Sequence, residues 1–266
     1  MIELKSLAVG YEGRAVLRNI SLTFPRGQVT VLLGPNGCGK STLLKALPGL
    51  SERLGGEILV EGKAIECFDS AALAREVSYL PQSHRVPDMT VERLVLHGRF
   101  PYLSYPRRYR KEDYAIAAEA MEQVGITEFA HTPLSKLSGG TRQKAYIAMA
   151  LAQDTGAVLL DEPNAFLDIA HQLQLMELCR DLASRGKAVV LVLHDLNLAL
   201  EYGDRIALLH EGGLLITGDP ETIYQSGALE RAFGVEVCRF ATPQGWHYAC
   251  RIPERSLHNV QFSHVC

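Results

Sequence analysis

A glycine-rich run that ends in a lysine and two hydroxyls is the strongest chemical signal in the sequence. Residues 34–42 read Gly-Pro-Asn-Gly-Cys-Gly-Lys-Ser-Thr, after a strand-like run and before a leucine-rich helical pattern. Glycines let backbone N–H groups approach phosphate oxygens, and a helix N-terminus attracts anions. In such a loop Lys40 reaches the outer phosphates and Ser41 binds Mg²⁺. The predicted nucleotide-binding residues are Gly34, Asn36, Gly37, Cys38, Gly39, Lys40, Ser41 and Thr42; the alternative is an ordinary glycine-rich turn.

Two carboxylates follow a second apolar run. Residues 157–160 read Ala-Val-Leu-Leu, and Asp161 and Glu162 come next. We expect Asp161 to hold Mg²⁺ and Glu162 to polarise an attacking water. An apolar strand that ends in an acidic turn is common, so this interpretation depends on the phosphate loop upstream.

A third signal is the run Leu137-Ser138-Gly139-Gly140-Thr141, shortly before the carboxylates. Ser138 is a favourable helix N-cap, and the two glycines leave backbone N–H groups accessible to an anion. The run therefore predicts a second phosphate contact, with an ordinary capped helix start as the alternative.

The elements that must position these groups are strands and helices in alternation, which predicts an α/β fold with a mainly parallel central sheet. In the first third, strand-like runs follow one another with few helical residues between them, which predicts an antiparallel β region at the start. These runs are residues 2–9, 20–24, 29–33 and 57–60. Later, helices are predicted over 112–124 and from Asp168 to Gly186, and strands over 188–193, 205–209, 214–217 and within 235–251.

Composition restricts the class of protein. The chain has 266 residues and a net charge of −3, so no strong positive field favours nucleic acid as a partner. No apolar run approaches the roughly eighteen residues of a membrane helix, and the N-terminus lacks the pattern of a secretory signal. The six cysteines form no metal-binding spacing. We therefore expect a chain that remains in the cytosol with reduced thiols.

The order of the motifs resembles that of the ATP-binding cassette (ABC) ATPases over nearly the whole chain. The elements after the phosphate loop are Tyr79-Leu80-Pro81-Gln82, Leu137-Ser138-Gly139-Gly140, Leu160-Asp161-Glu162-Pro163, Leu167-Asp168 and Leu193-His194-Asp195. The resemblance implies a P-loop NTPase fold, with an inserted helical subdomain at about 83–155 that carries the Ser138 motif. It implies an ATPase domain over 1–240 and a tail over 241–266 that completes it.

The same resemblance implies a head-to-tail dimer with Mg²⁺ and ATP, in which Ser138, Gly139 and Gly140 of one copy meet the γ-phosphate held by the other. The further roles it implies are Tyr11 for stacking on adenine, Gln82 for Mg²⁺ and water, Glu162 for water activation, His194 for the γ-phosphate and Asp168 for the dimer contact.

Three further segments resemble those of the ATPase subunits of bacterial importers for ferric siderophores, haem and cobalamin. They are Gly98-Arg99-Phe100-Pro101-Tyr102, Ala148-Met149-Ala150-Leu151-Ala152-Gln153 and Phe166-Leu167-Asp168-Ile169-Ala170-His171. The resemblance implies a peripheral subunit on the cytoplasmic face of the inner membrane. Two copies of this subunit bind a permease dimer, and a substrate-binding protein delivers the cargo to that permease. The region 83–110 is the expected permease contact, with candidates Tyr105, Arg107, Arg108 and Arg110; a solvated basic loop is the alternative. Ferric siderophore is the leading cargo, with haem and cobalamin as alternatives.

Two rival functions fit less well. A cassette protein that acts on ribosomes or DNA usually has two cassettes or a long coiled coil, and a small-molecule kinase would not need Ser138-Gly139-Gly140 or His194.

The sequence departs from the family at several positions. Thr141 stands where Gln is usual, and Asn164 where Ser or Thr is usual. We expect Thr141 to tune the rate of ATP hydrolysis without abolishing it, because backbone N–H groups and Ser138 carry the phosphate contact. An inactive enzyme that Thr141→Gln restores would contradict this.

Pro48 predicts that the helix after the phosphate loop ends or kinks at Leu47. Cys38 is a candidate for sensitivity to thiol reagents.

Overall fold

The structure is a computed structural model that describes residues 1–82, 86–243 and 245–253. Its central sheet has the strand order β10-β9-β3-β8-β7-β6, and neighbouring strands are parallel except for β10 and β9. In sequence order these strands are β3 (Gln28–Leu33), β6 (Val77–Leu80), β7 (Ala157–Asp161), β8 (Ala188–Val192), β9 (Arg205–His210) and β10 (Gly213–Gly218). The predicted α/β fold with a mainly parallel sheet is confirmed.

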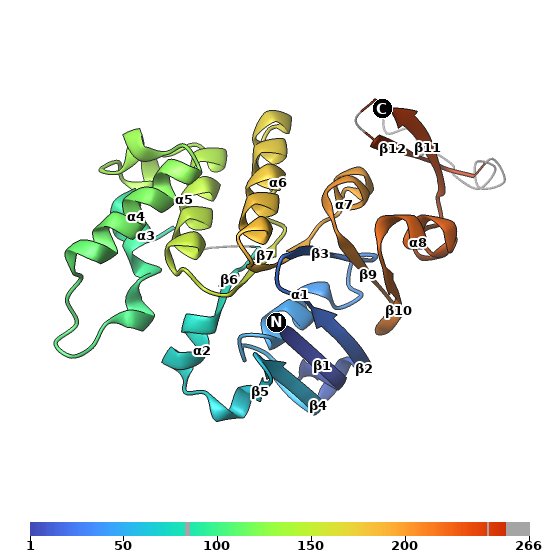
Figure 1. Cartoon of the computed structure of the whole chain (residues 1–266), viewed down its shortest axis with the longest axis horizontal. Helices are drawn as coiled ribbons and strands as arrows, with labels where there is room; N and C mark the ends of the chain where they lie inside the picture. The colour runs from blue at the N-terminus through green and yellow to red at the C-terminus, as the bar shows by residue number, and fades with distance from the viewer. Residues whose placement is uncertain (83–85, 244, 254–266) are drawn as a thin grey trace, which may run out of the picture.

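Both faces of this sheet are buried, because side chains alternate between two separate cores. In β3, Val31 belongs to the core on the side of the long helices, and Leu32 belongs to the core shared with the N-terminal strands. The same alternation places Leu160 in the first core and Leu159 in the second. Figure 1 shows the resulting layers, with α5, α6 and α7 on one side of the sheet and α1 and β1 on the other.

The N-terminal region forms the predicted antiparallel sheet, in the order β2-β1-β4-β5. Its strands are β1 (Ile2–Tyr11), β2 (Arg14–Phe24), β4 (Glu52–Val60) and β5 (Lys63–Ala64). One part of the prediction is wrong: residues 29–33 belong to β3 in the parallel sheet. Residues 29–33 are all buried, which is typical of a strand covered on both faces.

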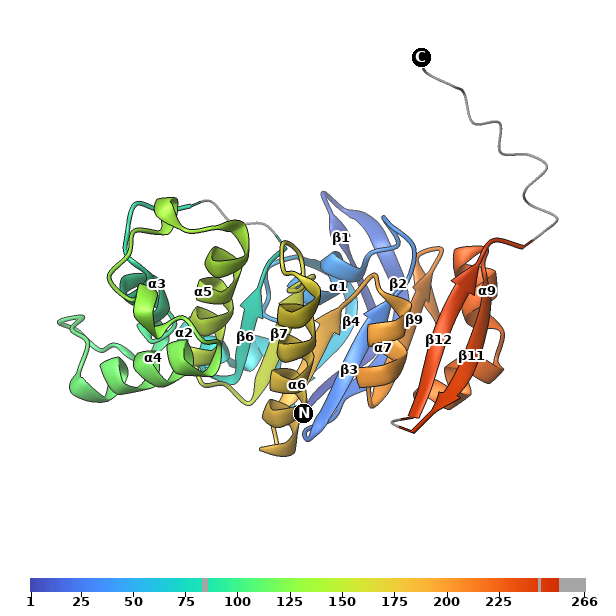
Figure 2. The same cartoon turned by 90° about the horizontal axis from the view of Figure 1, so that it is seen from above.

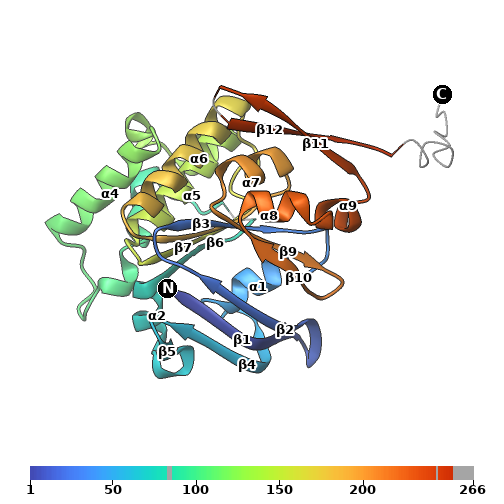
Figure 3. The same cartoon turned by 45° about the vertical axis from the view of Figure 1, so that its right-hand side comes forward.

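Helix α1 (Lys40–Ala46) packs between this antiparallel sheet and the central sheet (Figure 3). It begins at Lys40, within the last residues of the phosphate loop, and Leu43 and Leu44 are fully buried. The helix ends before Leu47, as predicted from Pro48, because proline lacks the N–H that would continue the hydrogen-bond ladder.

The elements described between β6 and β7 are all helical, and they lie at one end of the molecule (Figure 2). They are α3 (Val91–His97), η2 (Phe100–Tyr102), α4 (Lys111–Gln123), η3 (Thr127–Phe129), η4 (Leu134–Lys136) and α5 (Gly139–Ala152). The Ser138 motif therefore begins α5, within an inserted helical subdomain as predicted. The short elements η1 (Ile65–Cys67) and α2 (Ser70–Glu76) precede β6.

The remaining elements follow β7 and complete the fold. They are α6 (Ile169–Ser184), α7 (Leu196–Tyr202), α8 (Pro220–Gln225), α9 (Ala228–Phe233), β11 (Glu236–Thr242) and β12 (Gly245–Arg251). Strands β11 and β12 pair as an antiparallel hairpin at the opposite end from the helical subdomain (Figure 2). The hairpin crosses residue 240, so the division into 1–240 and 241–266 stays a prediction, and residues 244 and 254–266 of the tail lie outside the described residues. Among the described residues, no helix combines the length and apolar composition that a membrane crossing requires.

Candidate functional site

The phosphate loop has a backbone that only glycines adopt without strain. Gly34, Gly37 and Gly39 all have positive φ, and φ reaches +107° at Gly39, where α1 begins. A Cβ atom on Gly39 would lie 2.7 Å from Cγ of Leu17. A side chain at this position is therefore excluded by both the backbone angle and the neighbouring strand.

Lys40 lies beneath this loop and is 5% exposed. Its Nζ donates hydrogen bonds to the carbonyls of Gly34 (2.7 Å) and Pro35 (3.0 Å). A buried ammonium group needs such partners to offset its lost hydration. The two bonds hold the cation under the loop, where it can also meet a phosphate.

Asp161 ends β7 next to α1, and only 1% of its surface is exposed. One carboxylate oxygen accepts from Ser41 Oγ at 3.0 Å, and the other accepts from the Tyr79 hydroxyl at 3.3 Å. Burial raises the pKa of Asp161, and these two hydrogen bonds oppose the shift only in part. A divalent cation would offset the cost of burying this carboxylate, and carboxylate and hydroxyl oxygens suit Mg²⁺. The donor set therefore fits the predicted metal.

Glu162 connects the two polar residues expected beside it. Its Oε2 accepts from Gln82 Nε2 at 2.7 Å, and its Oε1 lies 2.6 Å from His194 Nε2. Its φ of +50° is rare for a residue with a side chain, and its N–H donates to the Val192 carbonyl. Strained backbone of this kind persists where the surrounding structure fixes it, and it is frequent at active sites.

These groups surround one cavity of about 450 Å³, the phosphate cavity. Its lining residues are Val16, Asn36, Gly37, Gly39, Lys40, Ser41, Thr42, Gln82, Glu162 and His194. The structure therefore brings together the phosphate loop, Gln82, Glu162 and His194 from separate parts of the chain. Tyr11 lies outside this lining, at the end of β1, and is 46% exposed.

Sequence reasoning missed two residues of this site. It gave no role to Val16, which lines the cavity, or to Tyr79, which donates to Asp161. Burial and the charge of Asp161 raise the pKa of Tyr79, so its hydroxyl stays protonated and remains a donor. The only available signal was the position of Tyr79 on the strand beside β7, which requires knowledge of the strand order.

Ser138, Gly139 and Gly140, which form the Ser138 turn, are not among the residues that line this cavity. Ser138 is exposed and caps α5, because its Oγ accepts from the Thr141 N–H at 3.1 Å and bonds the Thr141 hydroxyl. Gly139 instead borders a second cavity of about 360 Å³, which Gln82 and the exposed Phe166 also line. Gln82 therefore faces both cavities.

Asp168 is also away from the phosphate cavity. It caps α6 by accepting from the His171 N–H at 2.9 Å, and it pairs with His171 Nδ1 at 2.8 Å. The hydrogen bonds from the His171 N–H and from its ring hold the pKa of Asp168 below its usual range. A largely exposed carboxylate with this orientation is free to contact another chain.

Cys38 is buried within the loop, and burial raises the pKa of its thiol although Lys40 acts in the opposite direction. The thiolate is the reactive form, so this environment disfavours reaction with thiol reagents. The cysteines among the described residues carry no disulfide, and Cys266 lies outside them.

The expected permease segment is described from residue 86 onward, and residues 83–85 lie outside the described part. Tyr105, Arg107, Arg108 and Arg110 are all exposed, and Tyr105 is 97% exposed. The Arg107 guanidinium lies over the Phe100 ring at 4.6 Å. The loop thus presents cationic and aromatic side chains at the protein surface.

The sequence matches one protein-family model and several ATP-binding proteins of transport systems. Residues 17–165 match the family model described as ABC transporter. The achromobactin transport ATP-binding protein of Dickeya dadantii is 40% identical, over 95% of this chain and 94% of its own length. The ferric enterobactin transport ATP-binding protein of Escherichia coli K12 is 41% identical, over 87% of this chain and 86% of its own. The hemin import ATP-binding protein of Streptomyces coelicolor is 40% identical, over 90% of this chain and 85% of its own.

Solved structures agree with these matches. A chain from an inward-facing ABC transporter assigned to the metal-chelate type superimposes with a TM-score of 0.80 at 27% identity, over 94% of this chain and 97% of that one. A bacterial ABC transporter cassette solved as a dimer gives a TM-score of 0.72 at 27% identity, over 83% of this chain and 99% of that one.

Proposed function

The chain belongs to the ABC transporter family, and from that premise we propose that it is the ATP-hydrolysing subunit of a bacterial importer for ferric siderophores. The observation that carries the hydrolytic part is Glu162, held between Gln82 and His194 at the phosphate cavity. The cargo follows from relatives named for achromobactin and ferric enterobactin transport, which align with this chain over most of its length.

ATP binds with its phosphates on the loop from Gly34 to Thr42. The loop amides and Lys40 neutralise the phosphate charge, which is the main requirement of phosphoryl transfer. Ser41, Asp161 and Gln82 would hold Mg²⁺, which supplies further charge neutralisation on the phosphate oxygens. Tyr11 stacks on the adenine, beyond the end of the phosphate cavity; its exposed ring supports this role.

Glu162 orients and polarises the attacking water. Its carboxylate has one oxygen toward Gln82 and one toward His194, so both neighbours restrict its rotation. His194 also contacts the γ-phosphate. Because no covalent intermediate is required, these residues act by positioning water and stabilising charge.

Each complete site requires two copies of the chain in a head-to-tail homodimer. Ser138, Gly139 and Gly140 of one copy present backbone N–H groups to the γ-phosphate bound by the other, and Asp168 contacts the partner. Two observations support this arrangement: Ser138 is exposed, and it lies outside the cavity that Lys40 and Glu162 line.

The dimer binds a permease at the cytoplasmic face of the inner membrane, and a substrate-binding protein delivers the cargo from outside. Residues 86–110 supply the permease contact, and Tyr105 and the exposed arginines beside it support this. The net charge of −3 supports a function without nucleic acid.

Haem is the second candidate cargo. The hemin importer ATPase of Streptomyces coelicolor is 40% identical, which is as similar as the achromobactin relative. Cobalamin remains the third candidate by family likeness. Uptake assays with the chain and its permease distinguish them, because ferric siderophore should be transported and should compete with itself but not with haem.

The test of the hydrolytic role is Glu162→Gln, which keeps the side-chain shape and removes the water-polarising charge. We expect the ATPase rate to fall by about 10²–10⁴-fold while the affinity for ATP is retained. Glu177→Gln, at an exposed glutamate on α6, is the matched control and should leave the rate unchanged. Unchanged turnover in Glu162→Gln would contradict the assignment.

A further inference from the structure

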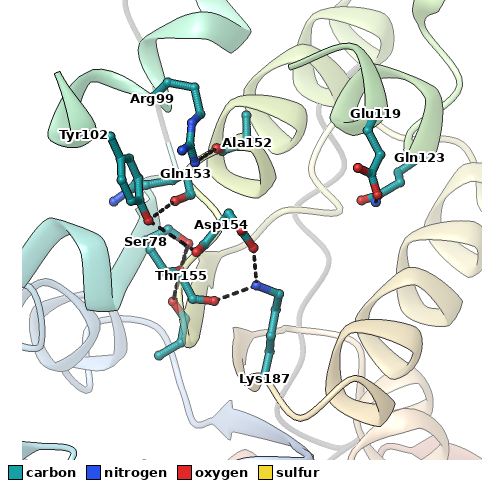
Figure 4. A network of polar contacts seen from close by, with 11 residues as sticks. Ser78, Arg99, Tyr102, Glu119, Gln123, Ala152, Gln153, Asp154, Thr155 and Lys187 are labelled. Carbon is teal, nitrogen blue, oxygen red and sulfur yellow. Dashed lines mark hydrogen bonds and ion pairs between the residues drawn. The ribbon is translucent and has the colours of Figure 1, made fainter. Parts of the chain in front are cut away.

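The segment Gly98–Tyr102, which has no role in the proposed hydrolysis, lies directly on the last turn of α5. Arg99 Nη1 donates to the Ala152 carbonyl at 3.0 Å, and the Tyr102 hydroxyl donates to the Gln153 carbonyl at 2.9 Å (Figure 4). A Cβ atom on Gly98 would lie 2.3 Å from the Met149 carbonyl oxygen. The glycine therefore permits a close approach that places Arg99 and Tyr102 on the free carbonyls at the helix end.

Arg99 connects this helix end to a second helix. Its Nε pairs with Asp113 Oδ1 at 3.1 Å, and both side chains are 9% exposed. The other carboxylate oxygen of Asp113 accepts from the Arg110 N–H at the start of α4. The guanidinium also lies over the Tyr102 ring at 3.9 Å. One side chain thus joins the start of α4 to the end of α5.

The same helix end is attached to the central sheet. Gln153 Nε2 donates to the carbonyls of Ala74 in α2 (2.5 Å) and of Val77, the first residue of β6 (3.2 Å). Beyond it, the Thr155 hydroxyl bonds Ser78, and Lys187 Nζ bonds Asp154 and the Thr155 carbonyl (Figure 4). The end of α5 is therefore fixed on two sides, by Arg99 toward the helical subdomain and by these contacts toward the core.

Ser138 lies at the opposite end of the same helix. Helix α5 has 14 residues, which corresponds to a rod of about 21 Å. A small tilt of α5 about its Ala152 end therefore moves the Ser138 turn by a larger distance than it moves the residues near Ala152. A single charged side chain at the fixed end can thus set the direction in which the turn points.

We propose that Arg99 is a positioning residue: by joining Asp113 on α4 to the Ala152 carbonyl, it sets the orientation in which the Ser138 turn meets a second copy of the chain. The inference rests on the proposed head-to-tail dimer. A lysine could keep the positive charge beside Asp113. Its ammonium group lacks the planar guanidinium of arginine, which reaches both Asp113 and the Ala152 carbonyl and stacks on the Tyr102 ring. Burial of an ion pair is poor evidence for stability alone, so the test must separate orientation from stability.

The experiment introduces Arg99→Met into the full-length Glu162→Gln chain, which should accumulate as an ATP-bound dimer. Sedimentation with ATP and Mg²⁺ measures dimerisation, and binding of a fluorescent ADP analogue measures the nucleotide site of the monomer. We expect the dimer dissociation constant to rise by about tenfold or more, with ADP affinity within about twofold of the parent. Arg99→Lys should fall between Arg99→Met and the parent.

Two further variants keep the result interpretable. Tyr102→Phe removes only the hydroxyl, which bonds the carbonyls of Gln153 (2.9 Å) and Asp154 (3.4 Å), so it should weaken dimerisation in the same direction, by about two- to fivefold. Arg180→Met is the chemical control, because Arg180 also lies over a tyrosine ring (Tyr202, 4.4 Å) and donates to a backbone carbonyl, but on α6. It should leave dimerisation unchanged.

The outcomes are distinguishable. Dimerisation of Arg99→Met equal to that of the parent would overturn the inference, as would a parallel loss of dimerisation and ADP affinity, which indicates a purely structural role. If the Glu162→Gln parent itself does not dimerise with ATP, the proposed function is contradicted, and the inference falls with it.

Discussion

The phosphate cavity and the Ser138 turn are both proposed to contact phosphate, but they are built in opposite ways. At the cavity, Lys40 and Asp161 are buried and partnered, and the backbone is held in unusual angles at Gly39 and Glu162. At the turn, Ser138 is exposed, and within the described part of the chain its hydroxyl bonds only with Thr141 of the same helix cap.

The difference supports the proposed dimer, in which the cavity is complete within one copy and the turn serves the site of the other copy. A buried charge must be balanced inside the same fold, so the cavity needs its partners in place before ligand arrives. An exposed cap has no such requirement. Its N–H groups can therefore serve a ligand that a second copy brings.

Of the changes that compare the two regions, loss of the buried cation Lys40 should have the largest effect. Lys40→Ala removes the ammonium beneath the loop, and we expect ATPase activity to fall by about 10²–10³-fold together with weaker nucleotide binding by the monomer. Lys45→Ala, in the last turn of the same helix, is the control. If Lys40→Ala binds nucleotide as well as the unmodified chain, the cavity is not the nucleotide site.

A change at the turn should separate hydrolysis from binding. Ser138→Arg places a bulky cation on the exposed cap, so we expect activity to fall by about 10²-fold with unchanged nucleotide affinity of the monomer. The control is Ser135→Arg, at an exposed position in η4. Weaker monomer binding in Ser138→Arg would remove the distinction between the two regions.

The smallest effect concerns the Cys38 thiol, which is buried within the phosphate loop. Because burial raises the pKa of Cys38, less thiolate is present at a given pH, and alkylation should be slower than at an unburied thiol. Peptide mass spectrometry after maleimide treatment at pH 7 should find exposed Cys67 modified at least about tenfold faster. Faster labelling of Cys38 would show that the loop opens readily.

The phosphate loop could be predicted from sequence because its chemistry is local. Residues 34–42 follow one another, so glycine spacing and the lysine indicate the backbone and its ligand without tertiary information. Asp161 and Glu162 could be paired with the loop only through motif order. Their contacts with Ser41, Gln82 and His194 depend on strands that come together in space.

The residues that were missed depend on sheet topology. Tyr79 reaches Asp161 because β6 and β7 are neighbours, and the local pattern around Tyr79 does not reveal this. Residues 29–33 were assigned to the antiparallel region because they follow other strands in sequence. Their nearly unbroken apolar composition, with Thr30 as the polar exception, was the better indicator, because a strand covered on both faces is apolar along most of its length.

The central claim, that each site combines the phosphate cavity of one copy with the Ser138 turn of another, is tested most directly by mixing two inactive variants. Lys40→Ala retains an intact turn, and Ser138→Arg retains an intact cavity, so a mixed dimer contains one complete site. We predict that equal mixtures recover up to about a quarter of the unmodified ATPase activity, since half of the dimers are mixed and each has one site of two. Activity that stays at the level of the separate variants would contradict the account.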